Sequence, residues 1–390
     1  MRHLTGACAG AAILLVALAA DGRSQGNLST FGFGYPPGQL STRAQSGGGA
    51  IGEIDPVSTL NPAALVNWGG SAVYFQVEPE FRTVTTPSVS DRTTTARYPL
   101  TTAALQLGTR WIAGVAWSTF LDRSWATRSR TMHQLGGEDV PATTTFRSEG
   151  AINDVRLAVA YVARPWLRVG LGAHALTGQN RLTVLDEFDD SLTFRPLRED
   201  TTISYRGAAL SAGVEVRAGR VASVAASARV GGRINSESGD ASLSRANVPN
   251  RFGVTVAYLG IANSAIALRT SYEKWSALNG LGSAGLRAVD AWDTGVGADI
   301  AGPRLGTDRP LMLRFGGRWR TLPFAVTPLD NGTVGEPRKV RERSISLGAG
   351  TSFARGRVTG DIGVIRSDRD AGLSVDERAW ILSLGISVRP

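Results

Sequence analysis

The chain has 390 residues, of which 42% are hydrophobic and 19% are charged, with a single cysteine and a net charge of +9. A disulfide scaffold is excluded because Cys8 has no partner. A helical membrane protein needs spans of about 18 or more apolar residues, whereas the one long apolar run here has ten residues, Ala11 to Ala20. Basic residues are spread among acidic ones without a basic run, which disfavours nucleic acid as a partner.

Residues 1–20 have the order of a secretory signal peptide. Arg2 and His3 precede the apolar run, and the run ends in small residues. A buried N-terminal helix is the alternative, but no polar-faced helical pattern continues after Asp21. We therefore expect cleavage and export, which leaves a mature chain without a thiol because Cys8 lies inside the signal peptide.

Residues 27–68 are rich in glycine and proline and show no alternation. They contain the triplet Gly47-Gly48-Gly49 and two later prolines, Pro56 and Pro62. Two interpretations remain open. The segment is either a disordered periplasmic tail or a compact plug inside a barrel, where glycine allows close backbone packing.

From Gly69 onward, apolar residues recur with a period of two, as in strands with two different faces. In the last segment, Trp380 and Leu384 fall on one face, while Ser383 and Gly385 fall on the other. The candidate strands lie near residues 70–85, 96–108, 110–121, 146–163, 166–178, 201–217, 220–234, 249–259, 264–276, 290–301, 309–320, 339–354, 357–367 and 377–389.

The connections between these segments alternate between long and short. Long polar connections such as 122–145 and 179–200 are separated by tight ones such as Arg164-Pro165. This pattern is typical of outer-membrane barrels, which close on themselves because lipid offers no hydrogen bonds. The sequence therefore predicts an all-β, 14-stranded antiparallel transmembrane β-barrel at residues 69–390 with both ends in the periplasm.

Many charged side chains fall on the face opposite the apolar one. A soluble sandwich or propeller would bury that face in a dry core, where unpaired charges are costly. We therefore predict a wetted or plugged lumen. The predicted lumen charges include Arg168, His174, Glu215, Arg217, Arg229, Arg269, Glu273, Arg314, Arg318 and Asp361.

The run from Arg43 to Ala50, then Asp55, then the triplet Asn61-Pro62-Ala63, resembles the N-terminal hatch of the FadL-type outer-membrane transporters of long-chain fatty acids and hydrophobic compounds. Tyr272 to Ser276 is similar to a signature late in that barrel, which we place in the ninth strand. The chain differs from the family at Pro56, Ala64 and the terminal Pro390.

The resemblance implies a hatch at 27–68 that closes the lumen, and passive, gated uptake of hydrophobic small molecules such as long-chain fatty acids. It also implies lateral exit at a kink in the third strand, for which Gly114 is the candidate. The favoured alternative for Gly114 is ordinary small-residue packing. Asn61, Pro62 and Ala63 have either a gating role or the structure of an ordinary Asn-Pro turn.

Five side chains are candidate lumen contacts for the head group of a ligand: Arg314, Arg318, Arg269, Arg168 and Trp275. Arginine binds a carboxylate through paired hydrogen bonds. The alternative is ion pairing inside the barrel or with the hatch. Apolar residues of the two longest connections, such as Leu135, Phe188 and Leu192, either form a first capture groove or pack loop against loop.

No catalytic group is apparent. The mature chain has only two histidines, His133 and His174, so neither a metal cluster nor a Ser/His/Asp set is expected. The acidic run from Asp186 to Asp190 is either a calcium loop or a solvated loop. We expect no enzyme activity, no cofactor and no metal.

The predicted protein is a monomer in the bacterial outer membrane, in contact with membrane lipid and lipopolysaccharide. Its predicted function is a channel for a hydrophobic small-molecule ligand. The alternative is a non-transporting barrel that binds or docks secreted proteins, like the shuttle proteins of secretion systems.

Overall fold

The computed structural model describes residues 34–85, 90–281, 287–304, 310–327, 329–330, 333–373 and 375–390. The predicted signal peptide and residues 27–33 lie outside this set. Within the described residues, no helix is both long and apolar enough to cross a bilayer.

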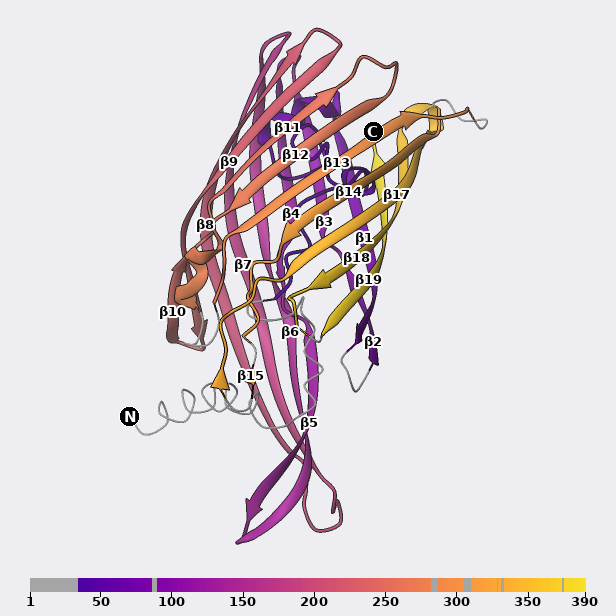
Figure 1. Cartoon of the computed structure of the whole chain (residues 1–390). Coiled ribbons are helices and arrows are strands. Elements are labelled where there is room, and N and C mark those ends of the chain that lie inside the picture. The colour runs from indigo at the N-terminus through magenta and orange to yellow at the C-terminus, as the bar shows by residue number, and fades with distance from the viewer. Residues whose placement is uncertain are drawn as a thin grey trace.

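The strands form one antiparallel sheet that closes when β1 (Ala72–Thr85) pairs with β19 (Asp376–Val388) (Figure 1). The predicted fold class, a closed barrel of 14 strands, is confirmed. The other wall strands are β2 (Ser90–Arg97), β3 (Leu100–Leu107), β4 (Trp111–Asp122), β5 (Trp125–Leu135), β6 (Glu138–Arg164), β7 (Leu167–Phe188), β8 (Leu197–Ala218), β9 (Ala222–Ser238), β10 (Ala241–Asn247), β11 (Arg251–Tyr258), β12 (Ala265–Glu273), β13 (Ala291–Ala301), β14 (Met312–Thr321), β17 (Arg341–Phe353) and β18 (Val358–Asp370).

Three of the wall strands are interrupted, so that two labelled segments make one strand. Thus β2 continues into β3, β4 into β5 and β10 into β11, each pair running beside a single neighbour. A small hairpin, β15 (Leu329–Asp330) with β16 (Thr333–Val334), and two short helices, η2 (Trp275–Leu281) and η3 (Ala354–Gly356), lie in connections.

The two longest predicted connections are largely strand, which corrects the expectation that they are loops. β5 pairs with the start of β6, and this hairpin projects beyond the barrel wall (Figure 1). Their apolar side chains pack on one another, Val140 and Phe188 with Leu135 and Phe194. This is the loop-against-loop alternative, although Leu192 remains 98% exposed.

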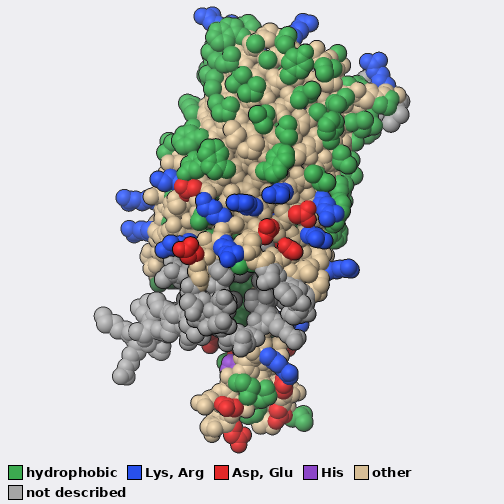
Figure 2. Space-filling view, viewed as in Figure 1, with side chains coloured by type: hydrophobic (Ala, Val, Ile, Leu, Met, Phe, Trp, Pro, Cys, Tyr) green, Lys and Arg blue, Asp and Glu red, His purple; other side chains and the backbone are tan. Residues whose placement is uncertain are grey.

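The outer surface carries a hydrophobic belt, as Figure 2 shows, with a band of charged side chains on the side of the projecting hairpin. Large apolar side chains such as Trp117, Leu171 and Phe315 point outward and are exposed. Since the neighbouring residues on the same strands point into the lumen, the alternation read from the sequence divides lipid-facing from lumen-facing positions.

The lumen holds the described part of the N-terminal segment, residues 34–68. It contains one helical turn, α2 (Thr42–Ser46), and one 3-10 helix, η1 (Pro62–Trp68). Most of its residues are buried and none is exposed, and both helices contact several wall strands. The position of this segment inside the lumen is that of a plug and differs from that of a periplasmic tail.

Candidate functional site

Glycines of the hatch contact glycines of the barrel wall at β13 and β14. A Cβ atom added to Gly316 of β14 would lie 2.4 Å from the backbone carbon of Gly47, and one added to Gly295 of β13 would lie 2.1 Å from the oxygen of Gly48. Gly48 itself has φ +65°, which favours glycine. The glycine-rich run of the hatch therefore docks by direct backbone contact.

The Asn61-Pro62-Ala63 triplet anchors the other end of the hatch. Asn61 caps η1 by accepting a hydrogen bond from the Ala63 amide at 2.9 Å, and its side-chain amide donates to the carbonyls of Glu53 at 2.9 Å and Val214 at 3.3 Å. Proline at the first helical position suits the cap. Asn61 therefore joins the hatch to β8.

Asp55, the acidic residue before the triplet, organises the hatch internally. One of its carboxylate oxygens accepts hydrogen bonds from the Ser41 hydroxyl at 2.7 Å and from the hydroxyl and amide of Ser58 at 2.6 Å and 2.9 Å. Asp55 is 2% exposed. Three donors on one buried oxygen hold the two arms of the hatch together.

Tyr35 joins the beginning of the described hatch to the wall strands β2, β4, β14 and β18. Its backbone exchanges two hydrogen bonds of 2.8 Å with Asp122. Its ring lies between the guanidinium groups of Arg97, Arg320 and Arg369, whose carbons are 4.6–5.0 Å from the ring centre. The hydroxyl donates to Glu342 at 3.1 Å.

A chain of three polar side chains lies on adjacent strands of the wall. His174 Nδ1 is 2.9 Å from both carboxylate oxygens of Asp154, and His174 Nε2 is 2.9 Å from Ser211 Oγ. The expectation that no Ser/His/Asp set can assemble was wrong, because strand register brings together residues that are distant in sequence. The hatch residue Gln39 donates to Asp154 at 2.7 Å, so the set also ties hatch to wall.

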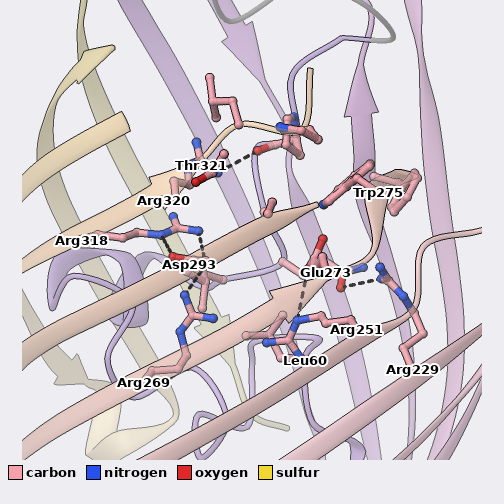
Figure 3. Close-up of a pocket in the computed structure, with 18 of the residues that line it drawn as sticks. Leu60, Arg229, Arg251, Arg269, Glu273, Trp275, Asp293, Arg318, Arg320 and Thr321 are labelled. Carbon is pink, nitrogen blue, oxygen red and sulfur yellow. Dashed lines mark hydrogen bonds and ion pairs between the residues drawn. The ribbon is translucent and has the colours of Figure 1, made fainter. Parts of the chain in front are cut away.

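A cavity of about 70 Å³ opens between the hatch and the wall (Figure 3). Phe120 and Trp275 line one side, stacked with ring centres 5.2 Å apart. They belong to an apolar cluster that includes Tyr205 and Phe324. The opposite side carries charges, so the cavity is amphipathic.

Most charges of the cavity are paired. Asp293 binds both Arg269 and Arg318, the latter through bonds of 2.7 Å and 2.8 Å, as Figure 3 shows. Arg251 is bound by the hatch carboxylate of Glu53 and lies 3.2 Å from Glu273. Carboxylates of the wall and of the hatch thus neutralise these cations.

Arg229 is the exception among the cations that line the cavity. Its nearest carboxylate is Asp154 at 4.0 Å, which is already bound by His174 and Gln39. Its Nη1 donates only a long hydrogen bond of 3.5 Å to Gln39 Oε1, and its Nε is buried without a hydrogen-bond partner among the described residues. The guanidinium lies 5.4 Å from the centre of the Phe120 ring, where charge and apolar surface meet.

No protein-family model matches the sequence, and no curated protein matches it. Solved structures do. A FadL homologue from Pseudomonas aeruginosa is similar with a TM-score of 0.61 over 92% of this chain and 99% of that chain, at 11% identity. The toluene transporter TodX of Pseudomonas putida gives 0.57 over 90% and 98%, at 12% identity. The toluene transporter TbuX of Ralstonia pickettii gives 0.54 over 92% and 98%, at 14% identity.

This chain has the FadL-type barrel fold.

The FadL-type barrel brings three of the five predicted head-group residues to one cavity: Arg269, Arg318 and Trp275. The other two lie elsewhere in ion pairs. Arg314 binds Asp361 at 2.6 Å and Asp299 at 3.3 Å, and Arg168 binds Glu215 at 3.1 Å. The ion-pair alternative therefore describes the geometry of all four predicted arginines.

Trp275 is not in a strand, contrary to the sequence-based assignment. β12 ends at Glu273, and Trp275 begins η2 with its ring buried among the apolar residues of the lumen. The sequence analysis did not name several cavity residues of the wall strands, among them Phe120, Arg251 and Asp293. Each has the inward parity of its strand, which was the available signal.

Gly114 is not a kink in this FadL-type barrel. It pairs in unbroken register with Ala104 on β3 and Ala158 on β6. The register shift of this strand lies between Thr119 and Leu121. A Cβ atom at Gly114 would lie 3.1 Å from the Leu65 side chain, so the glycine makes room for the hatch.

No group of three or more metal-ligating side chains occurs among the described residues. In the acidic run, Asp186 accepts a hydrogen bond from Thr144, and Asp189 pairs with Arg130 at 2.8 Å. Both carboxylates therefore have protein partners, and Asp186 is buried on β7 and not part of a solvated loop.

Proposed function

We propose that this protein is an outer-membrane channel for hydrophobic small molecules that carry an acidic head group, such as long-chain fatty acids. The observation that carries this proposal is the amphipathic cavity, in which the weakly paired Arg229 faces the stacked rings of Phe120 and Trp275. The carboxylate would bind Arg229, and the tail would lie on the aromatic side.

Passage through the lumen requires movement. The cavity measures about 70 Å³, whereas benzene occupies an engineered protein cavity of roughly 150 Å³. The ligand therefore enters only when Trp275 or the hatch shifts. Because Gln39 and Leu40 of the hatch line the same cavity, ligand binding and hatch position are coupled in this proposal.

Two of the similar structures are toluene transporters, so a neutral ligand class is compared with the acidic one. A neutral aromatic hydrocarbon would use the Phe120 and Trp275 side of the cavity alone. A fatty acid would use that side together with Arg229. The two ligand classes thus differ in their dependence on one side chain.

Substituting Arg229→Gln is expected to weaken oleate binding roughly tenfold, because a charge-assisted hydrogen bond contributes about 1.5–3 kcal/mol. Binding of an alkylbenzene should change less than twofold. Titration of the purified barrel in nanodiscs with both ligands measures the difference. Equal losses for both would contradict a head-group role.

Arg217→Gln is the matched control, since Arg217 is also an inward arginine but pairs with Glu215 and does not line the cavity. Mass spectrometry of the protein as purified provides an independent readout. A bound fatty acid supports transport, whereas an empty lumen with a co-purifying protein supports the docking alternative.

A further inference from the structure

Two groups of three outward arginines have the same arrangement on opposite halves of the sheet. In the Asn235 cluster, Arg206 of β8 and Arg245 of β10 lie directly opposite Asn235 of β9 on either side. Arg233 precedes Asn235 by two residues, on the same outer face. Since strands are about 4.8 Å apart, the three guanidinium groups can reach one anionic group.

The Asp368 cluster repeats this pattern on β17, β18 and β19. Arg343 and Arg378 lie directly opposite Asp368 on either side, and Arg366 precedes Asp368 by two residues. The strands run in the same directions in both clusters. The two sites therefore differ mainly at the central residue.

That central residue decides the local charge. Arg366 and Arg378 both lie 3.7 Å from an oxygen of Asp368. In the Asn235 cluster, by contrast, none of the three arginines makes an ion pair with any described residue. Glu237 lies two residues beyond Asn235 on the same face but makes no ion pair with these arginines. The Asn235 cluster is thus a concentration of unpaired positive charge, and the Asp368 cluster is largely neutralised.

The Asn235 cluster lies near the connection of β9 to β10, and the Asp368 cluster near that of β18 to β19. In an up-and-down barrel both connections are at the end from which the hairpin of β5 and β6 projects, the end where Figure 2 shows a charged band beside the hydrophobic belt. A groove of about 570 Å³ crosses the belt below the Asn235 cluster, floored by small residues such as Ala226, Ala228 and Gly253 and flanked by Phe252 and Trp292. Ala228 precedes Arg233 by five residues on β9, which is roughly 15 Å along the strand. A second groove, of about 430 Å³, lies below the Asp368 cluster.

We propose that the Asn235 cluster and its groove form a binding site for lipopolysaccharide of the outer leaflet, with a lipid A phosphate on the arginines and an acyl chain in the groove. A ligand that fills both the cationic cluster and the apolar groove is an amphiphile with an anionic head group. The end of a barrel with the long loops faces the cell exterior. In the outer leaflet on that side, lipopolysaccharide is the lipid that carries phosphates. The site rests on the outer-membrane placement proposed above, but not on transport.

Native mass spectrometry of the full-length barrel, titrated with lipid A in detergent, tests the site. We expect the wild-type protein to retain one lipid A, and R206Q/R233Q/R245Q to bind it at least tenfold more weakly. N235D should weaken binding similarly, because it recreates the neutralised arrangement. D368N should add a second bound lipid A.

The matched control is R343Q/R366Q/R378Q, which should leave lipid A binding unchanged. Lipid A without phosphates, and phosphatidylglycerol, should bind at least tenfold more weakly than lipid A. Unchanged binding in R206Q/R233Q/R245Q or N235D, no gain in D368N, or equal binding of the phosphate-free lipid overturns the proposal. A shift of the folded band on unheated gels verifies that each variant is a barrel, and oleate binding reports separately on the lumen.

Discussion

Replacing Gly316 by alanine is expected to loosen the hatch and make the barrel leak. The new Cβ would lie 2.4–2.6 Å from backbone atoms of Gly47 and Gly48, closer than side chains tolerate. Because backbone on both sides cannot yield like a side-chain tip, the hatch must shift. Overpacking of this kind costs about 1–3 kcal/mol, so the open fraction should rise roughly tenfold.

Conductance across a planar lipid bilayer measures this leak. Gly317→Ala is the matched control, since Gly317 is the next residue of β14 and a Cβ there would meet only the Trp319 ring, at 3.1 Å. Deleting residues 27–60 sets the upper limit of conductance. If the G316A barrel does not conduct while the deletion variant does, the hatch accommodates the methyl group without opening, which contradicts the prediction.

The strands were predictable because lipid imposes a strict rule on them. Each candidate segment overlaps a wall strand, since every second residue must be apolar where it faces lipid. The hairpin of β5 and β6 was not predicted as strand because it extends beyond the hydrophobic belt. There, residues such as Thr127, Arg128 and Arg130 form a strand without any apolar face.

The ion pairs inside the lumen were not predictable from the sequence. Parity indicates that Arg314 points inward, but strand stagger decides that it meets Asp299 on β13 and Asp361 on β18. The same holds for His174, whose partners Asp154 and Ser211 come from the two adjacent strands. Register, which one sequence does not encode visibly, assembles these groups.

The hatch contacts were beyond the sequence for a different reason. A segment without alternation does not indicate which wall residues it contacts, so the contacts of Tyr35 could not be predicted. For Gly114 the sequence left two interpretations, because glycine serves both for bulges and for close approach, and only the position of Leu65 distinguishes them here. The glycine-rich hatch run nevertheless indicated close backbone packing, which Gly47 and Gly48 display.

Replacing Arg369 by methionine is expected to destabilise the barrel more than any surface substitution. Arg369 is fully buried and binds Glu342 at 2.6 Å, Glu80 at 2.9 Å and Glu377 at 2.5 Å. It also donates to the Tyr35 hydroxyl at 2.9 Å. Removing one partner of a buried ion pair costs about 3–5 kcal/mol. The three carboxylates keep Arg82, Arg97 and Arg320 as partners, but the buried cluster loses one positive charge.

Urea-induced unfolding in lipid vesicles measures this free energy. Arg378→Met on the neighbouring strand is the control, since its side chain is 66% exposed and an exposed ion pair contributes about 0–1 kcal/mol. Adding Glu377→Gln to the Arg369→Met variant should recover part of the loss, because it removes one negative charge from a cluster that has lost a positive one. Glu377 also pairs with Arg82 at 3.2 Å. If the double variant is less stable than the single one, the loss comes from packing around Arg369, and the carboxylates of the cluster are not the source of the instability.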